Sequence, residues 1–119
     1  MARYTSVYKS GDTPVDHLRH CLAEILQSCN FDVIYEDNDY LVAKETPGGV
    51  SFAKLVTVEV LFGKTSLSES AVDSALHMSV VVKNEELPLN INNHCRQQFN
   101  RLNRVVSSNH QVQLIESAA

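Results

Sequence analysis

Glu59 and His77 are the two residues of this sequence best placed to do chemistry together. Alternation of apolar and polar residues predicts two long strands, over residues 51–62 and 71–83, with both side chains on one face of neighbouring strands. A carboxylate in that position could orient an imidazole or tune its charge, as in a general base. Opposite charges across a sheet are also ordinary ion pairs. An enzyme that uses Glu59 and His77 is therefore one hypothesis, and it requires a pocket that converges on them.

Other groupings have the residue types of a site without its full pattern. His17, His20 and Cys21 fall within one helical turn, but no CxxC or second His/Cys pair accompanies them as in known zinc spacings. Glu36, Asp37 and Asp39 form an acidic cluster, yet the segment lacks the later glycine and glutamate of a calcium loop. The three cysteines fall on apolar helical stripes, which indicates packed thiols rather than nucleophiles. Our primary interpretation therefore assigns no catalytic residue, no cofactor and no metal site.

The most distinctive predicted surface is basic. Residues 91–110 carry three arginines and no acid, whereas residues 1–90 carry seven Lys/Arg against thirteen Asp/Glu. At 100° per residue, Arg96, Arg101 and Arg104 gather on the polar side of a helix, where guanidinium groups could bind carboxylates or phosphates. No aromatic residue accompanies them and the net charge is −4, so nucleic acid is not an expected partner. The alternative is a solvated helix surface that balances an acidic body.

The elements that position these residues predict an α+β fold. Apolar residues at helical spacing predict amphipathic helices over residues 14–29 and 91–106. Period-two alternation and turn residues predict strands at residues 3–9, 31–36, 40–43, 51–62 and 71–83. The expected fold is an antiparallel sheet of five strands, or six if Val112 and Leu114 form an edge strand, with two helices packed on one face in the order β-α-β-β-β-β-α. This order resembles helix-grip and TATA-binding-protein-like folds in topology, which by itself implies no function.

Length and composition predict one domain over residues 1–119, with an ordered core at about 3–106 and a C-terminal tail at 107–119. The chain is 44% hydrophobic and 20% charged, as in ordinary globular proteins. It begins without a signal-peptide pattern, and no apolar stretch approaches the ~20 residues of a membrane helix. An odd number of cysteines indicates free thiols in a reducing compartment. We therefore predict a cytoplasmic protein without a membrane partner.

The sheet face opposite the helices is the other candidate surface. The alternation pattern places six apolar residues there: Ile34, Leu41, Leu55, Leu61, Ala75 and Val81. Monomers rarely leave such a patch uncovered, and a twofold dimer buries the same surface of both subunits. We therefore predict a non-catalytic protein-interaction or assembly module that self-associates, whose partner-binding residues are Leu55, Leu61, Val81, Arg96, Arg101 and Arg104. A small-molecule binding domain with an apolar cavity between helix and sheet remains the alternative.

Overall fold

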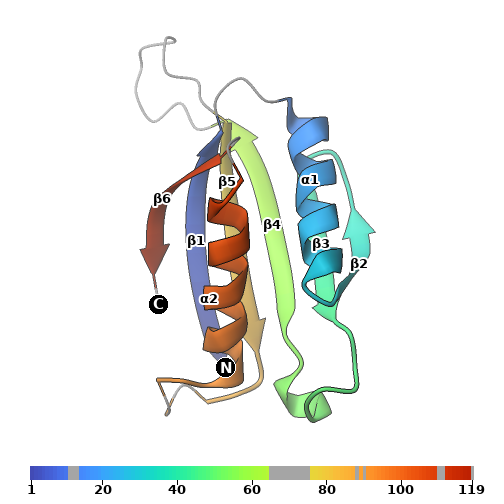
Figure 1. The fold of residues 1–119 in the computed structure, drawn as a ribbon, viewed down its shortest axis with the longest axis vertical. Helices are drawn as coiled ribbons and strands as arrows, with labels where there is room; N and C mark the ends of the chain where they lie inside the picture. Colours follow the sequence, from blue (N-terminus) through green and yellow to red (C-terminus); the bar gives the residue numbers. More distant parts are fainter. Residues whose placement is uncertain (11–13, 65–75, 88, 90, 110–111, 119) are drawn as a thin grey trace.

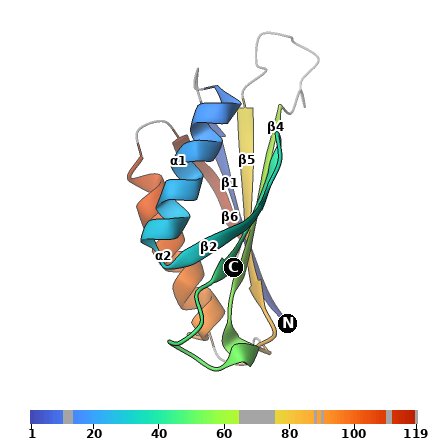
Figure 2. The ribbon, with the colours of Figure 1, turned by 90° about the vertical axis from the view of Figure 1, so that its right-hand side faces the viewer.

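Six antiparallel strands form one sheet, and both helices lie on the same side of it (Figures 1 and 2). The computed structural model describes residues 1–10, 14–64, 76–87, 89, 91–109 and 112–118. The elements are β1 Ala2–Ser10, α1 Val15–Ser28, β2 Phe31–Glu36, β3 Tyr40–Glu45, the 3-10 turn η1 Phe52–Lys54, β4 Thr57–Lys64, β5 Leu76–Asn84, α2 His94–Ser107 and β6 Val112–Ala118. The strand order across the sheet is β2-β3-β4-β5-β1-β6. The predicted α+β class and element order are confirmed.

The C-terminal segment is part of this sheet. Strand β6 pairs antiparallel with β1, so β1 lies between β5 and β6. The sequence predicted this sixth strand only as an alternative, from the alternation at Val112 and Leu114. The sheet thus continues past the predicted core boundary at residue 106, and β6 occupies most of the range that the sequence pattern assigned to a tail.

The apolar stripes of the two helices pack on the inner face of the sheet. Helix α1 buries Leu18, Leu22 and Leu26, and α2 buries Cys95, Phe99, Leu102 and Val106. Their partners in the core include Val58, Val60, Met78, Val80 and Val82 of the two central strands. The predicted helical phases are confirmed, because Leu22 and Phe99 are both buried. Neither helix, nor any other in the described part of the chain, is long and apolar enough to cross a membrane.

The strand predicted from residue 51 begins later. Phe52, expected on its buried face, is 81% exposed on the turn η1. The pairing of β3 with the next strand ends where the Glu45 N–H donates to the Val56 carbonyl. The preceding residues close a 3-10 turn instead, in which the Lys54 N–H donates to Ser51. Strand β4 therefore starts at Thr57.

Two apolar residues lie elsewhere than the alternation predicted. Leu41 was expected on the outer face, but it pairs with Val60, which faces the helices, and it is fully buried. Ile91 was expected on the helical stripe, but α2 begins only at His94, because the Asn93 side chain caps it by accepting the Arg96 N–H. Ile91 is therefore 80% exposed. Ala75 lies outside the described residues.

Candidate functional site

The outer face of the sheet is not covered by any helix or strand of the described chain (Figure 2). Because side chains alternate along a strand, the residues between the buried ones point to this face. At its centre lie Val7, Val42, Leu61 and Val81, one from each of β1, β3, β4 and β5. We call these four residues the outer apolar band. Leu61 is 51% exposed, whereas Val81 is shielded by its neighbours to 7%.

The predicted partner-binding residues of the sheet are brought together in part. Leu61 and Val81 lie diagonally across β4 and β5, since Leu61 pairs with Ser79 and Glu59 pairs with Val81. Leu55 is not on a strand. It follows η1, is half-buried, and lines a pocket at the lower end of the outer face. The alternation therefore predicted the face of Leu61 and Val81 correctly, and failed where the strand had not yet begun.

Glu59 and His77 share the outer face but do not meet. Glu59 pairs with Val81, whereas His77 pairs with Gly63, four residues further along β4. At about 3.4 Å per residue, this register separates them by roughly 14 Å. The Glu59 carboxylate instead lies 2.8 Å from the Lys83 amine. Neither residue lines either of the two pockets described below.

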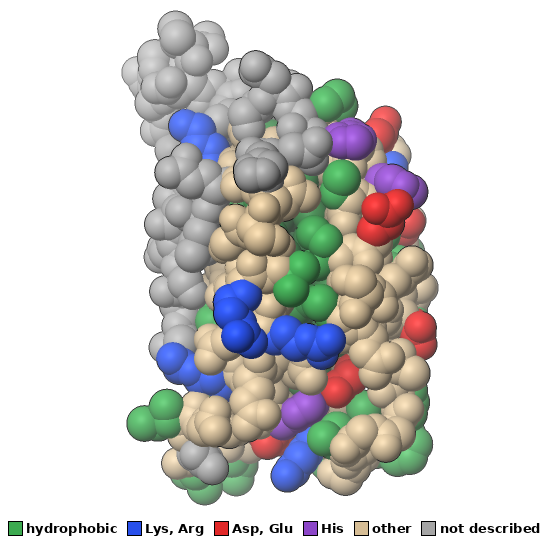
Figure 3. All heavy atoms as spheres, viewed as in Figure 1, with side chains coloured by type: hydrophobic (Ala, Val, Ile, Leu, Met, Phe, Trp, Pro, Cys, Tyr) green, Lys and Arg blue, Asp and Glu red, His purple; other side chains and the backbone are tan. Residues whose placement is uncertain are grey.

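The three arginines of α2 lie in different surroundings. The Arg96 guanidinium lies 5.7 Å from the centre of the Tyr4 ring, on the β1 side of the helix. Arg101 donates to the Cys29 carbonyl at 3.2 Å and so links α2 to the end of α1. Arg104 is exposed. Figure 3 shows basic side chains over α2, and acidic side chains and histidines over α1.

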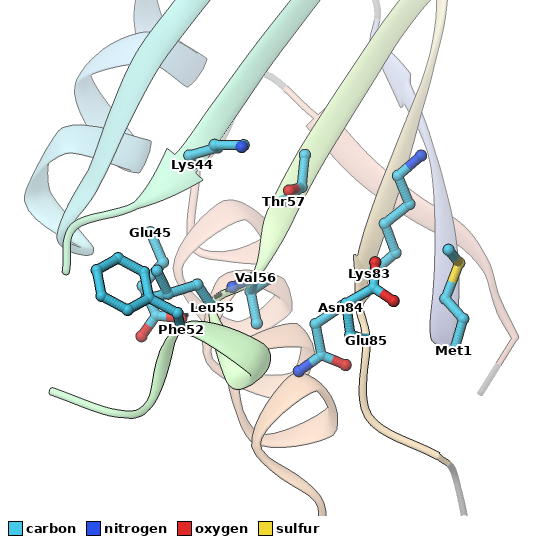
Figure 4. Close-up of a pocket in the computed structure, with 10 residues that line it drawn as sticks. All are labelled: Met1, Lys44, Glu45, Phe52, Leu55, Val56, Thr57, Lys83, Asn84 and Glu85. Carbon is cyan, nitrogen blue, oxygen red and sulfur yellow. Dashed lines mark hydrogen bonds between the residues drawn. The ribbon is translucent and has the colours of Figure 1, made fainter.

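The lower end of the outer face carries a row of cationic side chains. Lys44 pairs with Thr57, Thr57 with Lys83, and Lys83 with Arg3, so these residues lie side by side across β3, β4, β5 and β1. We call these three cationic residues, together with Thr57 between two of them, the basic row. Below the row is a pocket of about 270 Å³, the outer pocket, which Figure 4 shows in close-up. Its lining includes Lys44, Thr57 and Lys83 of the row, with Phe52 and Leu55 beside them.

A buried polar cluster behind this pocket was missed by the sequence analysis. His94 Nε2 lies 2.9 and 3.0 Å from the two carboxylate oxygens of Glu45. That carboxylate also accepts the Val56 N–H at 3.1 Å and the Gln98 side-chain amide at 3.5 Å. The side chains of His94 and Glu45 are only 15% and 8% exposed. The cluster therefore fastens the start of α2 to the end of β3. No local spacing connects residues 45 and 94, so only the fold reveals it.

A second carboxylate holds the first turn of α2. Glu86 accepts the backbone N–H of His94 and of Cys95, and its other partner is the Asn84 side-chain amide. Burial raises the pKa of Glu86, but these hydrogen bonds together outweigh it and lower the pKa below its ordinary value. Glu86 and His94 also line a second pocket of about 360 Å³, together with Lys54, Asn92 and Gln97. Because Glu86 is committed to the backbone of α2, its role here is structural.

The thiols and the histidines of the two helices lie in different surroundings. Burial raises the pKa of the Cys95 thiol to about 12, so it stays protonated at neutral pH and is a poor nucleophile. Cys21 Sγ lies 3.8 Å from His17 Nε2, while His20 pairs with Glu24 at 3.0 Å. The described residues contain no group of three His, Cys, Asp or Glu side chains arranged to hold a metal ion.

No protein-family model, curated protein or solved structure matches this chain.

Proposed function

We propose that this protein is a non-catalytic interaction module that self-associates through the outer face of its sheet. The observation that carries the proposal is the placement of both helices on one side, so that no helix or strand among the described residues covers the outer apolar band of Val7, Val42, Leu61 and Val81. Contiguous apolar surface on a soluble protein usually marks an interaction site. A second copy carries the same surface, and a twofold axis buries both at once.

The projected size of this face supports the proposal. Six strands span about 29 Å at about 4.8 Å each, and the eight residues of β4 span about 27 Å. Since the outer strands are shorter, the face has a projected area of about 700 Å², of the same order as the roughly 800 Å² of accessible surface that each partner buries in a standard interface. Two sheets packed face to face at about 10 Å would interdigitate these side chains as in a β-sandwich.

The polar residues near the centre of the face are compatible with such contact. Lys83 and Glu59 neutralise each other at 2.8 Å. Thr5, Ser79 and Thr57 are small hydroxyl residues that separate the aliphatic side chains. An apolar centre with polar residues around it is the usual anatomy of an interface.

The test is the oligomeric state of the wild type and of two matched variants. Leu61→Glu places a charge in the proposed interface, at a side chain exposed enough for the monomer to tolerate it. Ile91→Glu places the same charge at another exposed aliphatic residue, outside the face. We expect a wild-type dimer in sedimentation equilibrium, weakened at least about tenfold by Leu61→Glu and unaffected by Ile91→Glu.

Circular dichroism of each variant separates interface loss from unfolding. A folded, dissociated Leu61→Glu supports the proposal. A wild type that stays monomeric from micromolar to millimolar concentration overturns it, and so does a dimer that both variants weaken equally.

A further inference from the structure

The basic row is an arrangement of like charges that the described residues only partly compensate. Lys83 and Arg3 are directly opposite each other on β5 and β1, a placement that is unfavourable in a sheet. Glu59 pairs with Lys83, and Asp32 lies opposite Lys44 on β2. Neither Arg3 nor Lys44 makes an ion pair with another described side chain. Positive charge is therefore available at this end of the outer face.

Two of these cations flank a hydroxyl at the edge of the outer pocket. Lys44 and Lys83 lie on either side of Thr57, so their Cα atoms are about 10 Å apart across two ladder spacings. In Figure 4 the Lys44 amine points toward Thr57, whose hydroxyl points back toward Lys44. The Lys83 side chain extends away from Thr57 in the same view and pairs with Glu59. An anion placed above Thr57 would therefore receive hydrogen bonds from the hydroxyl and from the Lys44 amine.

The other wall of the outer pocket is apolar and held in place. Phe52 is 81% exposed on η1, beside the half-buried Leu55. The turn is fixed by its own backbone hydrogen bonds and by the Asn84 side chain, whose amide donates to the Lys54 carbonyl at 3.0 Å. A large aromatic side chain thus stands in water on an anchored turn, where an apolar ligand surface could cover it.

We propose that the outer pocket binds a small ligand in which one anionic group, a phosphate or a carboxylate, is attached to an aromatic ring. The anion lies on Lys44 and Thr57, beside the Lys83–Glu59 ion pair, and the ring lies against Phe52 and Leu55. The volume of about 270 Å³ lies just below the roughly 300–1,000 Å³ of pockets for drug-sized ligands, so a single ring fits best. Glu45 and Glu85 also line the pocket and disfavour a polyanion. This site does not depend on the proposed self-association.

Phenyl phosphate and phenylacetate test both parts of the site, while inorganic phosphate and benzyl alcohol each test one part. The measurement is amide chemical-shift titration of the folded protein, repeated in Leu61→Glu so that a dimer cannot compete for the outer face. We expect the two combined ligands to bind more tightly than either fragment. The amide shifts should centre on Phe52, Thr57 and Lys83.

Substitutions in the pocket test which side chains contact the ligand. Lys44→Gln should weaken phenyl phosphate about tenfold, as the loss of one charge-assisted hydrogen bond does, and Phe52→Ala should weaken it by a similar factor. Lys9→Gln is the matched control, because Lys9 is an exposed lysine at the opposite end of the same face and pairs with His77 in register. Absence of binding by both combined ligands, shifts centred elsewhere, or equal effects of Lys44→Gln and Lys9→Gln would overturn the proposal.

Discussion

Removing the His94 ring should destabilise this protein far more than removing a surface histidine does. In His94→Ala the Glu45 carboxylate loses its contacts at 2.9 and 3.0 Å and stays in a site where its side chain is 8% exposed. It keeps the Val56 N–H and the weaker Gln98 amide. Alanine is a good helix former, so the backbone of α2 adds no cost of its own.

The size of the loss in the free energy of unfolding depends on the hydrogen-bond donors that remain to the Glu45 carboxylate. Removing one partner of a fully buried pair costs about 3–5 kcal/mol, because the other charge is left uncompensated. Here two donors remain and the histidine site is partly open to water, so we expect a loss of about 2–3 kcal/mol in the free energy of unfolding. Adding Glu45→Gln to His94→Ala should recover part of this loss, since no buried charge then remains.

Urea unfolding followed by circular dichroism measures these differences at neutral pH. The control is His20→Ala, which also removes a histidine from a carboxylate at 3.0 Å, but from a pair whose side chains are 71% and 67% exposed. An exposed pair of this kind contributes about 0–1 kcal/mol. If His94→Ala costs no more than His20→Ala, the Glu45–His94 contact does not fasten α2 to the sheet and the reasoning fails.

Two further substitutions test the core and the start of α2. Phe99→Ala should lower the free energy of unfolding in urea by about 3–5 kcal/mol, because Phe99 is 2% exposed and its ring stacks on Tyr4 with centroids 5.4 Å apart. Ile91→Ala, at an exposed residue, should change it by no more than about 0.5 kcal/mol. Similar losses in both variants would contradict the packing. Glu86 has a lowered folded-state pKa, so its contribution to stability is complete above its unfolded pKa of 4.5 and is lost as the pH falls through the folded value. Unfolding of Glu86→Gln should therefore depend less on pH below about 4.5 than that of the wild type or of the exposed neighbour variant Glu85→Gln, and identical acid profiles would refute the capping role.

Periodicity predicted those parts of the fold in which one face alone is buried. Leu22 and Phe99 belong to apolar stripes because each helix buries only one face. The three- and four-residue spacing of such a stripe can be recognised in a short window of the sequence. The same logic placed Leu61 and Val81 on the outer face. It failed at Phe52, where apolar residues continue the alternation although no strand is paired, since hydrogen bonding to β3 ends near Val56.

The candidate sites depend on contacts that cross long stretches of sequence. Glu45 and His94 are 49 residues apart and meet only because the end of β3 and the start of α2 lie at the same edge of the fold. The basic row is likewise assembled from four strands, and its members have no common local spacing. The prediction that Glu59 and His77 form a pair was wrong for a different reason. Its two strands are neighbours, but register is set by pairing, and a displacement of four residues separates the side chains.

Glu45 links the buried cluster to the outer pocket and limits what the pocket can bind. It lies in the wall of the pocket, while both of its carboxylate oxygens face the His94 ring. A carboxylate without that partner would offset the charge of Lys44 across the cavity, and an incoming anion would meet little net attraction. Because the His94 contact engages the carboxylate from the inner side, Lys44, which makes no ion pair with another described side chain, is the cation left available on the outer side. In the ligand site proposed above, the contact that holds α2 on the sheet would therefore also favour a single anionic group at Thr57.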